Sequence, residues 1–327
     1  MGLVLIVAKR VFYAIALLVA VLVLNFFLIH LSPGDPAQVI AGEMGGASAE
    51  QLERIRAAYG LDRPLVEQLG IYLAQVAQGN LGYSFYFDRP VLDLIVTRIP
   101  ATVLLVVTAL IMAIGIGTLL GVLASRKPNG LVSHAITVGA LFGFSTPVFW
   151  IGIMLMILFA GVLQIFPVSG MRSVTMRDVG YLEYMLDVLW HLVLPAVTLA
   201  VIYIAQYSRL SRASMLETLG SDYIRTARAK GVPERRVVFK HALRNAILPV
   251  VTMAGLQFSQ LFAGAILVET VFNWPGLGRL AFESILRRDY PTLLGILFFS
   301  ALIVVVVNLL TDFVYRLVDP RIRTSSS

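Results

Sequence analysis

The sequence predicts an all-α polytopic membrane protein with six transmembrane helices and both termini in the cytoplasm. Three observations support this fold class. Of the 327 residues, 58% are hydrophobic and only 14% are charged, whereas about 25% are charged in an average soluble domain. Six long segments contain no Asp, Glu, Lys or Arg, and about 20 apolar residues are enough to cross a bilayer. The basic residues gather on every second connection, as the positive-inside rule predicts.

The spans and their connections follow in order along the chain. Lys9 and Arg10 precede the first apolar run, which places residues 1–10 in the cytoplasm. We predict spans at residues 11–31, 99–125, 131–165, 188–208, 245–268 and 292–317. The longer connections are an outer segment (32–98), a cytoplasmic segment (209–244), an outer loop (269–291) and a cytoplasmic tail (318–327). The first run is longer than a signal-peptide core and lacks a small-residue cleavage site, so we predict a permanent helix.

The number of times that residues 128–171 cross the membrane decides on which side the later segments lie. The uncharged run 128–171 is long enough for one helix or for two. Residues 209–244 carry nine Lys and Arg residues and lie in the cytoplasm only if the run crosses once, so we predict one span with a kink at Pro147. The cytoplasmic segments then hold 16 of the 26 basic residues and five of the 19 acidic ones. Topology thus explains the net charge of +7, and we expect no nucleic-acid partner.

Two short amphipathic helices are predicted in the outer segment. Ser48 and Gln51 have the spacing of a capping box, and Gly60 ends the helix that follows. Pro64 opens a second helix, which Gly79 ends. We expect both helices to lie on the outer membrane face or to cap a pore.

The cytoplasmic segment contains a short helix between two turns. Gly220 interrupts the helix that leaves the fourth span, Ser221 and Asp222 are favourable N-caps, and a helix over 223–230 ends at Gly231. Its small residues allow a partner to approach the backbone, and its cationic side chains protrude. The segment is either a rigid helix that docks on a partner or a basic loop that only fixes the topology, and the residue pattern leaves both interpretations open.

The sequence lacks the patterns of a self-sufficient enzyme or pump. It has no Gly-Lys pair for a phosphate-binding loop, no nucleophile pattern and no cysteine, and its four histidines lie far apart. Ionisable residues within the spans are nearly absent, which disfavours coupling to protons or sodium. Any uphill transport would therefore draw its energy from a partner. Two glycine pairs at four-residue spacing, Gly117 with Gly121 and Gly139 with Gly143, predict close helix packing.

Several short motifs occur in a fixed order along nearly the whole chain. The cytoplasmic segment carries two of them, DYIRTARAKG (222–231) and HALRNAILP (241–249). The others are SPGDP (32–36), GLDRP (60–64), RIPAT (98–102), ETVF (269–272), WPGLGR (274–279), RDYP (288–291) and DPRIR (319–323). Together they resemble the permeases of ABC importers, and more closely the dipeptide/oligopeptide/nickel permease family. Within that family they resemble the first of the two permease subunits, the type that begins with a long outer loop. The resemblance implies a type I ABC importer permease fold, with the core permease domain at 99–317 and the outer segments in the periplasm.

By that resemblance, the short cytoplasmic helix is the coupling helix, which sits in a groove of an ATP-hydrolysing subunit. The residues implied in this contact are Asp222, Tyr223, Arg225, Thr226, Ala227, Arg228, Ala229 and Gly231. Only Ala227 and Gly231 match the core of the general EAA pattern of such permeases. The implied partners are a second homologous permease, two ABC ATPase subunits, an extracytoplasmic solute-binding protein and membrane lipid. The chain itself would be a non-catalytic subunit of the bacterial inner membrane without a cofactor, while the partner ATPases bind ATP and Mg.

The outer loop 269–291 is rich in turn residues. One interpretation places Trp274, Gly276, Gly278 and Arg279 at the outer mouth, where a binding protein docks; the other is a plain connecting loop with an interfacial tryptophan. The expected function is import of di- or oligopeptides through half of a translocation pathway. Nickel chelates, glutathione-like peptides and sugars are alternatives within the same family. An ion-coupled carrier, a channel and a membrane-embedded enzyme are alternatives outside it.

Overall fold

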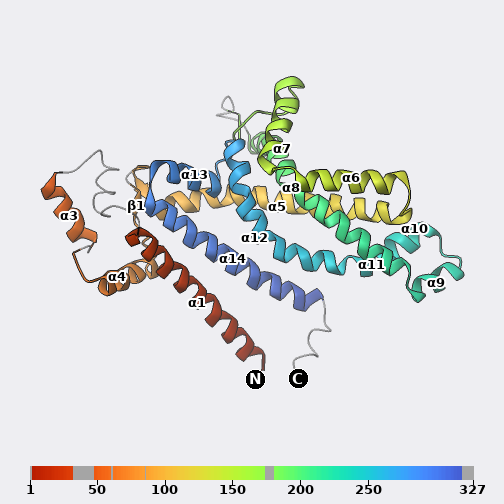
Figure 1. The fold of residues 1–327 in the computed structure, drawn as a ribbon, viewed down its shortest axis with the longest axis horizontal. Coiled ribbons are helices and arrows are strands. Elements are labelled where there is room, and N and C mark those ends of the chain that lie inside the picture. Colours follow the sequence, from red (N-terminus) through yellow and green to blue (C-terminus); the bar gives the residue numbers. More distant parts are fainter. Residues whose placement is uncertain (1, 32–47, 60–61, 85, 174–179, 319–327) are drawn as a thin grey trace. The chain divides into compact units, whose positions relative to one another are not determined.

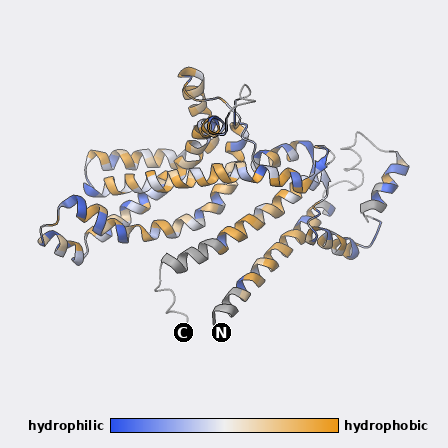
Figure 2. Cartoon of the chain, turned by 180° about the vertical axis from the view of Figure 1, so that it is seen from behind, coloured by the Kyte–Doolittle hydropathy of each residue, from blue (hydrophilic) through white to orange (hydrophobic). Residues whose placement is uncertain are grey.

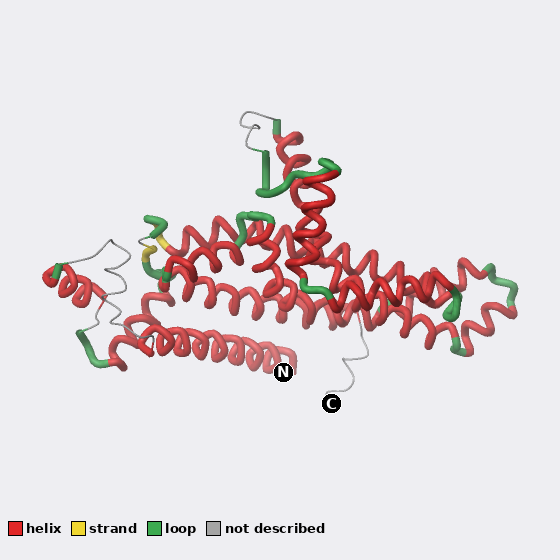
Figure 3. The backbone as a smooth tube through the Cα atoms, turned by 45° about the horizontal axis from the view of Figure 1, so that its top comes forward, coloured by secondary structure: helices red, strands yellow, loops and turns green. Residues whose placement is uncertain are grey.

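The structure is a computed structural model that describes residues 2–31, 48–59, 62–84, 86–173 and 180–318. Helices make up almost all of these residues (Figures 1 and 3), in agreement with the predicted all-α class. The chain divides into two units, one formed by residues 1–100 with 280–306 and the other by residues 101–279 with 307–327. The motifs at 32–36 and 319–323 and the predicted stop at Gly60 lie outside the described residues.

In the described part of the chain, four helices are long and apolar enough to cross a membrane (Figure 2). They cover Ala8–Leu28, Val91–Arg126, Tyr181–Leu219 and Tyr290–Leu309. The number rises to six if each of two bent pairs is one span, namely Leu131–Ser145 with Val148–Val162 and Glu234–Ala246 with Leu248–Gly255. Length and composition therefore support a polytopic membrane protein with four to six spans.

The first unit contains the N-terminal helix and the outer segment. Its elements are α1 (Gly2–Leu31), α3 (Ala49–Tyr59), α4 (Leu65–Ala77), β1 (Tyr83–Ser84), β2 (Arg89–Pro90), the start of α5 (Val91–Arg126), most of α13 (Leu277–Arg287) and most of α14 (Tyr290–Val318). The two strands form a short antiparallel hairpin in which Tyr83 pairs with Pro90. Neither this hairpin nor α13 is predicted from the sequence.

Polar contacts join segments of this unit that are distant in sequence. Asp289 is fully buried, and its carboxylate accepts hydrogen bonds from Ser84 Oγ (2.5 Å) and from the Thr292 amide (3.2 Å). Asp289 therefore caps the first turn of α14 and holds the hairpin against it. On α1, Asn25 Nδ2 donates to the Leu294 carbonyl of α14 at 3.3 Å.

The start of α3 and both ends of α4 agree with their sequence signals. The Gln51 amide donates to Ser48 Oγ, and the Ser48 amide donates to Gln51 Oε1 at 2.8 Å, which completes the predicted capping box. Helix α4 begins directly after Pro64. Gly79 follows the end of α4 with a φ of +81°, a left-handed conformation that glycine adopts without a steric cost. The capping box, the start of α4 after Pro64 and its end at Gly79 are therefore confirmed.

The second unit holds the remaining helices. After α5 come α6 (Leu131–Ser145), α7 (Val148–Leu155), the π-helical η1 (Met156–Val162), α8 (Tyr181–Leu219), α9 (Asp222–Ala229), α10 (Glu234–Arg236), the π-helical η2 (Val237–Ala242), α11 (Leu243–Ala246), α12 (Leu248–Val271) and the start of α13. Helix α8 packs against α6, α7 and α12. The most apolar stretch of α8 is 61% buried, against 17–33% in the other three candidate spans, so α8 is the central helix of this unit.

The kink predicted at Pro147 is a sharp break. Helix α6 and the continuous piece formed by α7 and η1 make an angle of 108° across Thr146 and Pro147. Proline lacks an amide hydrogen and forces the residue before it out of the helical region. Thr146 accordingly has the extended angles φ −94° and ψ 134°. Residues 131–165 therefore form two separate helical pieces rather than one gently bent helix.

One of the two predicted glycine pairs packs as expected. A β-carbon at Gly117 or at Gly121 would lie 2.6 Å from an atom of α8, so the backbones of α5 and α8 are in direct contact. In the second pair, a β-carbon at Gly143 would lie 3.0 Å from the Val201 side chain of α8. A β-carbon at Gly139 would meet no atom within 4 Å. The packing prediction is therefore wrong for Gly139, because that face of α6 is open in this unit.

Candidate functional site

The predicted short helix is α9, whose boundaries agree with the expected ones although its start is capped differently. Helix α8 ends before Gly220, and α9 begins at Asp222. Ser221 occupies the N-cap position, but its hydroxyl donates to the Thr218 carbonyl at 2.6 Å and makes no cap hydrogen bond to α9. Asp222 brings a carboxylate to the first turn, where it stabilises the positive end of the helix dipole.

The C-terminal end of α9 is a Schellman turn. The Gly231 amide donates to the Arg228 carbonyl at 2.9 Å, and the Val232 amide donates to the Ala227 carbonyl at 3.3 Å. Gly231 has a φ of +73°, and no atom lies within 4 Å of the position a β-carbon would take. The backbone conformation, and not a lack of space, therefore requires glycine at this position.

One buried residue anchors α9 to the rest of its unit. Ile224 is fully buried in a cluster with Val122 of α5, Met215 of α8 and Val237 of η2. Ala227, three residues further along α9, packs against the same cluster. The side of α9 that carries Ile224 and Ala227 is therefore part of a hydrophobic core. This favours the interpretation of α9 as a rigid docking helix over that of a loose basic loop.

The opposite side of α9 is exposed and largely cationic. Of the eight residues implied in docking, Ala227 is half-buried, and the exposed ones are Asp222, Tyr223, Arg225, Thr226, Arg228, Ala229 and Gly231. Lys230 adds a further exposed cation. In Figure 1, α9 lies beyond the neighbouring ends of α5, α6 and α8. The helix thus offers a compact surface to a partner at one end of its unit.

Two side-chain contacts fix the position of α9. Arg228 donates hydrogen bonds of 3.2 and 2.8 Å to the two carboxylate oxygens of Glu234 on α10. The hydrogen bond from Arg228 holds the pKa of the Glu234 carboxyl below its ordinary value. Asn245 Nδ2 on α11 donates to Tyr223 Oη at 2.8 Å. Helix α9 is therefore tied to α11 near its first residues and to α10 near its last.

The segment predicted as an outer loop folds around a buried carboxylate. Glu269, near the end of α12, is fully buried and accepts hydrogen bonds from Thr102 Oγ1 (2.6 Å) and from the amides of Gly278 (2.7 Å) and Arg279 (3.1 Å). Both amides belong to the first turn of α13, so the carboxylate stabilises the start of that helix. Thr102 Oγ1 in turn accepts a hydrogen bond from the Leu277 amide at 2.8 Å.

Three of the four residues expected at the outer mouth are buried parts of this turn. Trp274 is fully buried, and its Nε1 donates to the Ala101 carbonyl at 2.9 Å. Gly276 and Gly278 are also buried. A β-carbon at Gly276 would overlap the Glu269 carboxylate, and one at Gly278 would lie 2.5 Å from the backbone of α12. These three residues therefore have little accessible surface and their contacts hold the turn itself, while docking of a binding protein at this turn stays a prediction.

The fourth residue, Arg279, is partly exposed, and its Nη1 donates to the carbonyl of the exposed Asn273 at 3.2 Å. The plain connecting loop with an interfacial tryptophan is likewise not what the structure shows, since Trp274 is fully buried.

Sequence reasoning missed the two residues that organise these segments. Ile224 is an aliphatic residue in an otherwise polar helix, three positions from Ala227, and this spacing is a usable signal for a buried face. Glu269 is an acid that directly follows an uncharged span, a place where burial requires a partner. Its partner Thr102 lies 167 residues away, so no local pattern could have identified the pair.

Apolar helices that are long enough to cross a membrane are thus combined with a short helix, α9, which is anchored on one side and carries exposed cations on the other. The sequence matches the family described as the binding-protein-dependent transport system inner membrane component over residues 117–324, and the N-terminal region of such membrane components over residues 3–106. The chain therefore belongs to the binding-protein-dependent transport system inner membrane components. It is a multi-pass protein of the bacterial inner membrane.

Similar proteins match the chain over nearly its full length. The dipeptide transport system permease protein DppB of Escherichia coli K12 is 42% identical, over 97% of this chain and 98% of that protein. The di/tripeptide transport system permease protein DppB of Pseudomonas aeruginosa UCBPP-PA14 is 41% identical with the same coverage. Among solved structures, the MetNI methionine ABC transporter in an inward-facing conformation matches with a TM-score of 0.55 at 17% identity, over 69% of this chain and 96% of that chain. This match shows a shared fold.

Proposed function

We propose that the chain is one of two membrane-spanning subunits of an ATP-driven ABC importer and forms half of a pathway for di- and oligopeptides. The observation that carries the proposal is the construction of α9, which is exposed on one side and anchored by Ile224 on the other. The names of the relatives, which describe dipeptide and di/tripeptide transport, support the peptide substrate. Because selection would lie largely in the binding protein, nickel chelates, glutathione-like peptides and sugars are the alternatives to test.

Helix α9 would couple ATP binding to movement of the spans. Two ATPase subunits close on ATP, and a helix seated in a groove of one of them moves with it. Ile224 shares its hydrophobic cluster with Val122 of α5, Met215 of α8 and Val237 of η2, so displacement of α9 also displaces these elements. The pathway would then open outward, receive its solute from the binding protein, and release it inward after hydrolysis.

The proposed topology has six spans with both termini in the cytoplasm. It takes α6 with α7 and η1 as one span and α12 as another, and it places residues 209–244 inside. The distribution of the basic residues supports this arrangement. The partners in the proposal are a second homologous permease, two ATPase subunits that bind ATP and Mg, and an extracytoplasmic binding protein. Of the residues at the end of α12, Arg279 is the one we retain as a contact for the binding protein, since it is partly exposed.

The test is a pair of glycine variants in the complete importer, reconstituted with its ATPases and binding protein. Gly231→Val forces a β-branched residue into a left-handed conformation, which costs about 1–2 kcal/mol and distorts the end of α9. Gly79→Val is the matched control, because Gly79 also ends a helix, has a φ of +81°, and would have no atom within 4 Å of its β-carbon. Gly231→Val should insert normally and retain ATP hydrolysis, but lower peptide uptake by about tenfold, an effect of about 1.4 kcal/mol.

Unchanged uptake in Gly231→Val, or an equal loss in Gly79→Val, would contradict the coupling role of α9. Peptide uptake by the purified chain without ATPase subunits would instead identify an ion-coupled carrier or a channel. Binding assays on the partner binding protein with dipeptides, nickel chelates, glutathione and sugars separate the possible substrates.

A further inference from the structure

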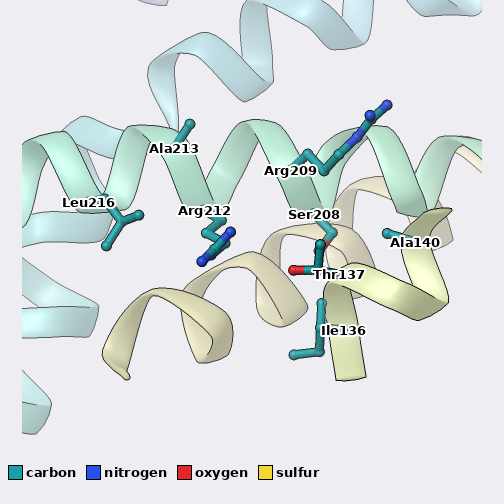
Figure 4. A pocket seen from close by; sticks show the side chains of 8 residues that line it. All are labelled: Ile136, Thr137, Ala140, Ser208, Arg209, Arg212, Ala213 and Leu216. Atoms are coloured by element: carbon teal, nitrogen blue, oxygen red, sulfur yellow. The ribbon is translucent and has the colours of Figure 1, made fainter. Parts of the chain in front are cut away.

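A groove of about 290 Å³ lies between α6 and α8 in the second unit (Figure 4). Its walls are mostly apolar, with Ile136 and Ala140 on α6 and Leu216 on α8. Two arginines on α8, Arg209 and Arg212, line the same groove and are one turn apart. Figure 4 shows the two arginine side chains directed to opposite sides of α8, so the groove combines a hydrocarbon-like surface with a positive charge on either side.

Neither arginine is neutralised by an acid within the described residues. The Arg212 Nη2 donates to the Pro128 carbonyl at 3.2 Å, while its Nε is buried without a hydrogen-bond partner in the described structure. The Arg209 guanidinium lies 5.1 Å from the centre of the Phe144 ring, a cation–π contact that leaves its charge uncompensated. None of the residues lining the groove is acidic. Arg209 is exposed and Arg212 is half-buried, and two cations beside an apolar groove without counter-charge favour an anionic ligand.

The position of the groove indicates which kind of anion would bind there. The predicted fourth span ends at Ser208, so Arg209 and Arg212 lie at the boundary between the hydrocarbon layer and the cytoplasm. Helix α6 also exposes large apolar side chains beside the groove, with Val138 66% and Leu141 62% exposed. Apolar surface that continues from a membrane-facing helix into a groove with cations at headgroup depth is suited to a lipid.

We propose that this groove binds an anionic phospholipid, with the phosphate against Arg212, with Arg209 as a second cation at the same depth, and with an acyl chain along Ile136, Ala140 and Leu216 (Figure 4). The inference rests on the proposed topology, which places Arg209 and Arg212 at the cytoplasmic leaflet, where anionic lipids attract basic side chains. It does not depend on which solute the importer carries.

The test measures lipid binding to the importer complex, purified with its partner subunits, by native mass spectrometry with phosphatidylglycerol and with phosphatidylcholine. The double variant Arg209→Gln/Arg212→Gln removes the groove charges. The matched control is Arg235→Gln/Arg236→Gln, which removes two exposed charges of α10 outside the groove. We expect preferential retention of phosphatidylglycerol, reduced by about fivefold for each groove arginine removed, and unchanged in the control variant.

Equal retention of the two lipids by the wild-type complex would overturn the proposal, and so would an equal loss of phosphatidylglycerol in both double variants. Inorganic phosphate, added as a competitor, separates a lipid site from a site for free anions. If millimolar phosphate displaces phosphatidylglycerol completely, the apolar wall contributes nothing and the lipid assignment fails. None of these measurements uses transport, so they succeed or fail separately from the proposed function.

Discussion

Two helix-to-helix turns in the second unit are built in opposite ways. The segment that carries α9, residues 220–233, is exposed over most of its length. It is joined to its unit by the buried Ile224, by the half-buried Ala227, and by side-chain hydrogen bonds of Tyr223 and Arg228. The turn between α12 and α13, residues 269–279, buries its carboxylate, its tryptophan and both of its glycines. In the first segment, the left-handed backbone of Gly231 requires glycine. In the second, Gly276 and Gly278 are required because a β-carbon would have no space.

The difference separates a turn that leaves most of its polar surface accessible from a turn whose polar groups are buried and hydrogen-bonded. Helix α9 keeps its polar side chains outside and uses a small core only to hold its orientation. The Glu269 turn directs its polar groups inward, where hydrogen bonds hold it in one conformation. A motif rich in glycine and turn residues can therefore belong to either class, and burial of the surrounding residues decides which.

The largest effect is expected from Glu269→Ala. The change leaves the Thr102 hydroxyl and the amides of Gly278 and Arg279 buried without their acceptor, and each such group costs about 1–3 kcal/mol. We expect little folded protein, as measured by size-exclusion chromatography and thermal unfolding of the full-length chain in detergent. The exposed Glu217 on α8 provides the control, since Glu217→Ala should change stability by less than about 0.5 kcal/mol. Normal melting of Glu269→Ala would remove the contrast between the two turns.

A smaller and more local effect is expected from Ile224→Ala. Loss of a fully buried isoleucine costs about 2–5 kcal/mol, and the cavity lies where α9 packs against α5, α8 and η2. We expect the membrane helices to remain folded while α9 becomes sensitive to limited proteolysis and peptide uptake falls. Glu217→Ala, at an exposed position on α8 outside the residues implied in docking, should leave both measurements unchanged. If Ile224→Ala unfolds the whole chain, α9 is part of the folding core and the distinction drawn above fails.

The smallest effect concerns the ion pair between Arg228 and Glu234. Hydrogen bonding from Arg228 lowers the pKa of Glu234 in the folded state, so the pair stabilises the protein above the ordinary glutamate pKa of about 4.3. This contribution is lost as the pH falls through the lowered pKa of Glu234. Both side chains are about half exposed, and such pairs contribute at most about 1 kcal/mol.

Glu234→Gln should therefore make α9 slightly easier to cleave by protease at neutral pH, and it should abolish the additional loss seen on acidification. An unaltered pH profile in this variant would show that the pair does not hold α9.

The parts of the fold that the sequence predicts correctly depend on neighbouring residues. The capping box at Ser48 and Gln51, the stop at Gly79, and the stop at Gly231 each involve residues within a few positions of one another. Their physics is local, so the sequence pattern suffices. The same holds for the break at Pro147, where the angles of Thr146 follow from the proline ring.

The parts that escape prediction depend on contacts between distant residues. Trp274 is interfacial or buried according to whether Ala101 lies beside it, and the two are 173 residues apart. Gly139 and Gly143 have the same four-residue spacing as Gly117 and Gly121. Close packing also requires a neighbouring helix on that face, which the sequence pattern does not reveal. For α9, the sequence predicted the helix and its exposed cations but missed Ile224, whose burial requires η2 and α5 to converge on it.

Helix α8 has a mechanical consequence that follows from its length. It is a single helix of 39 residues, about 58 Å long at 1.5 Å per residue, which is nearly twice the thickness of the bilayer's hydrocarbon layer of about 30 Å. Pro195 removes one hydrogen bond inside it without ending the helix. A push at the Leu219 end therefore reaches the Tyr181 end through one continuous rod, with no loop between them to absorb the motion.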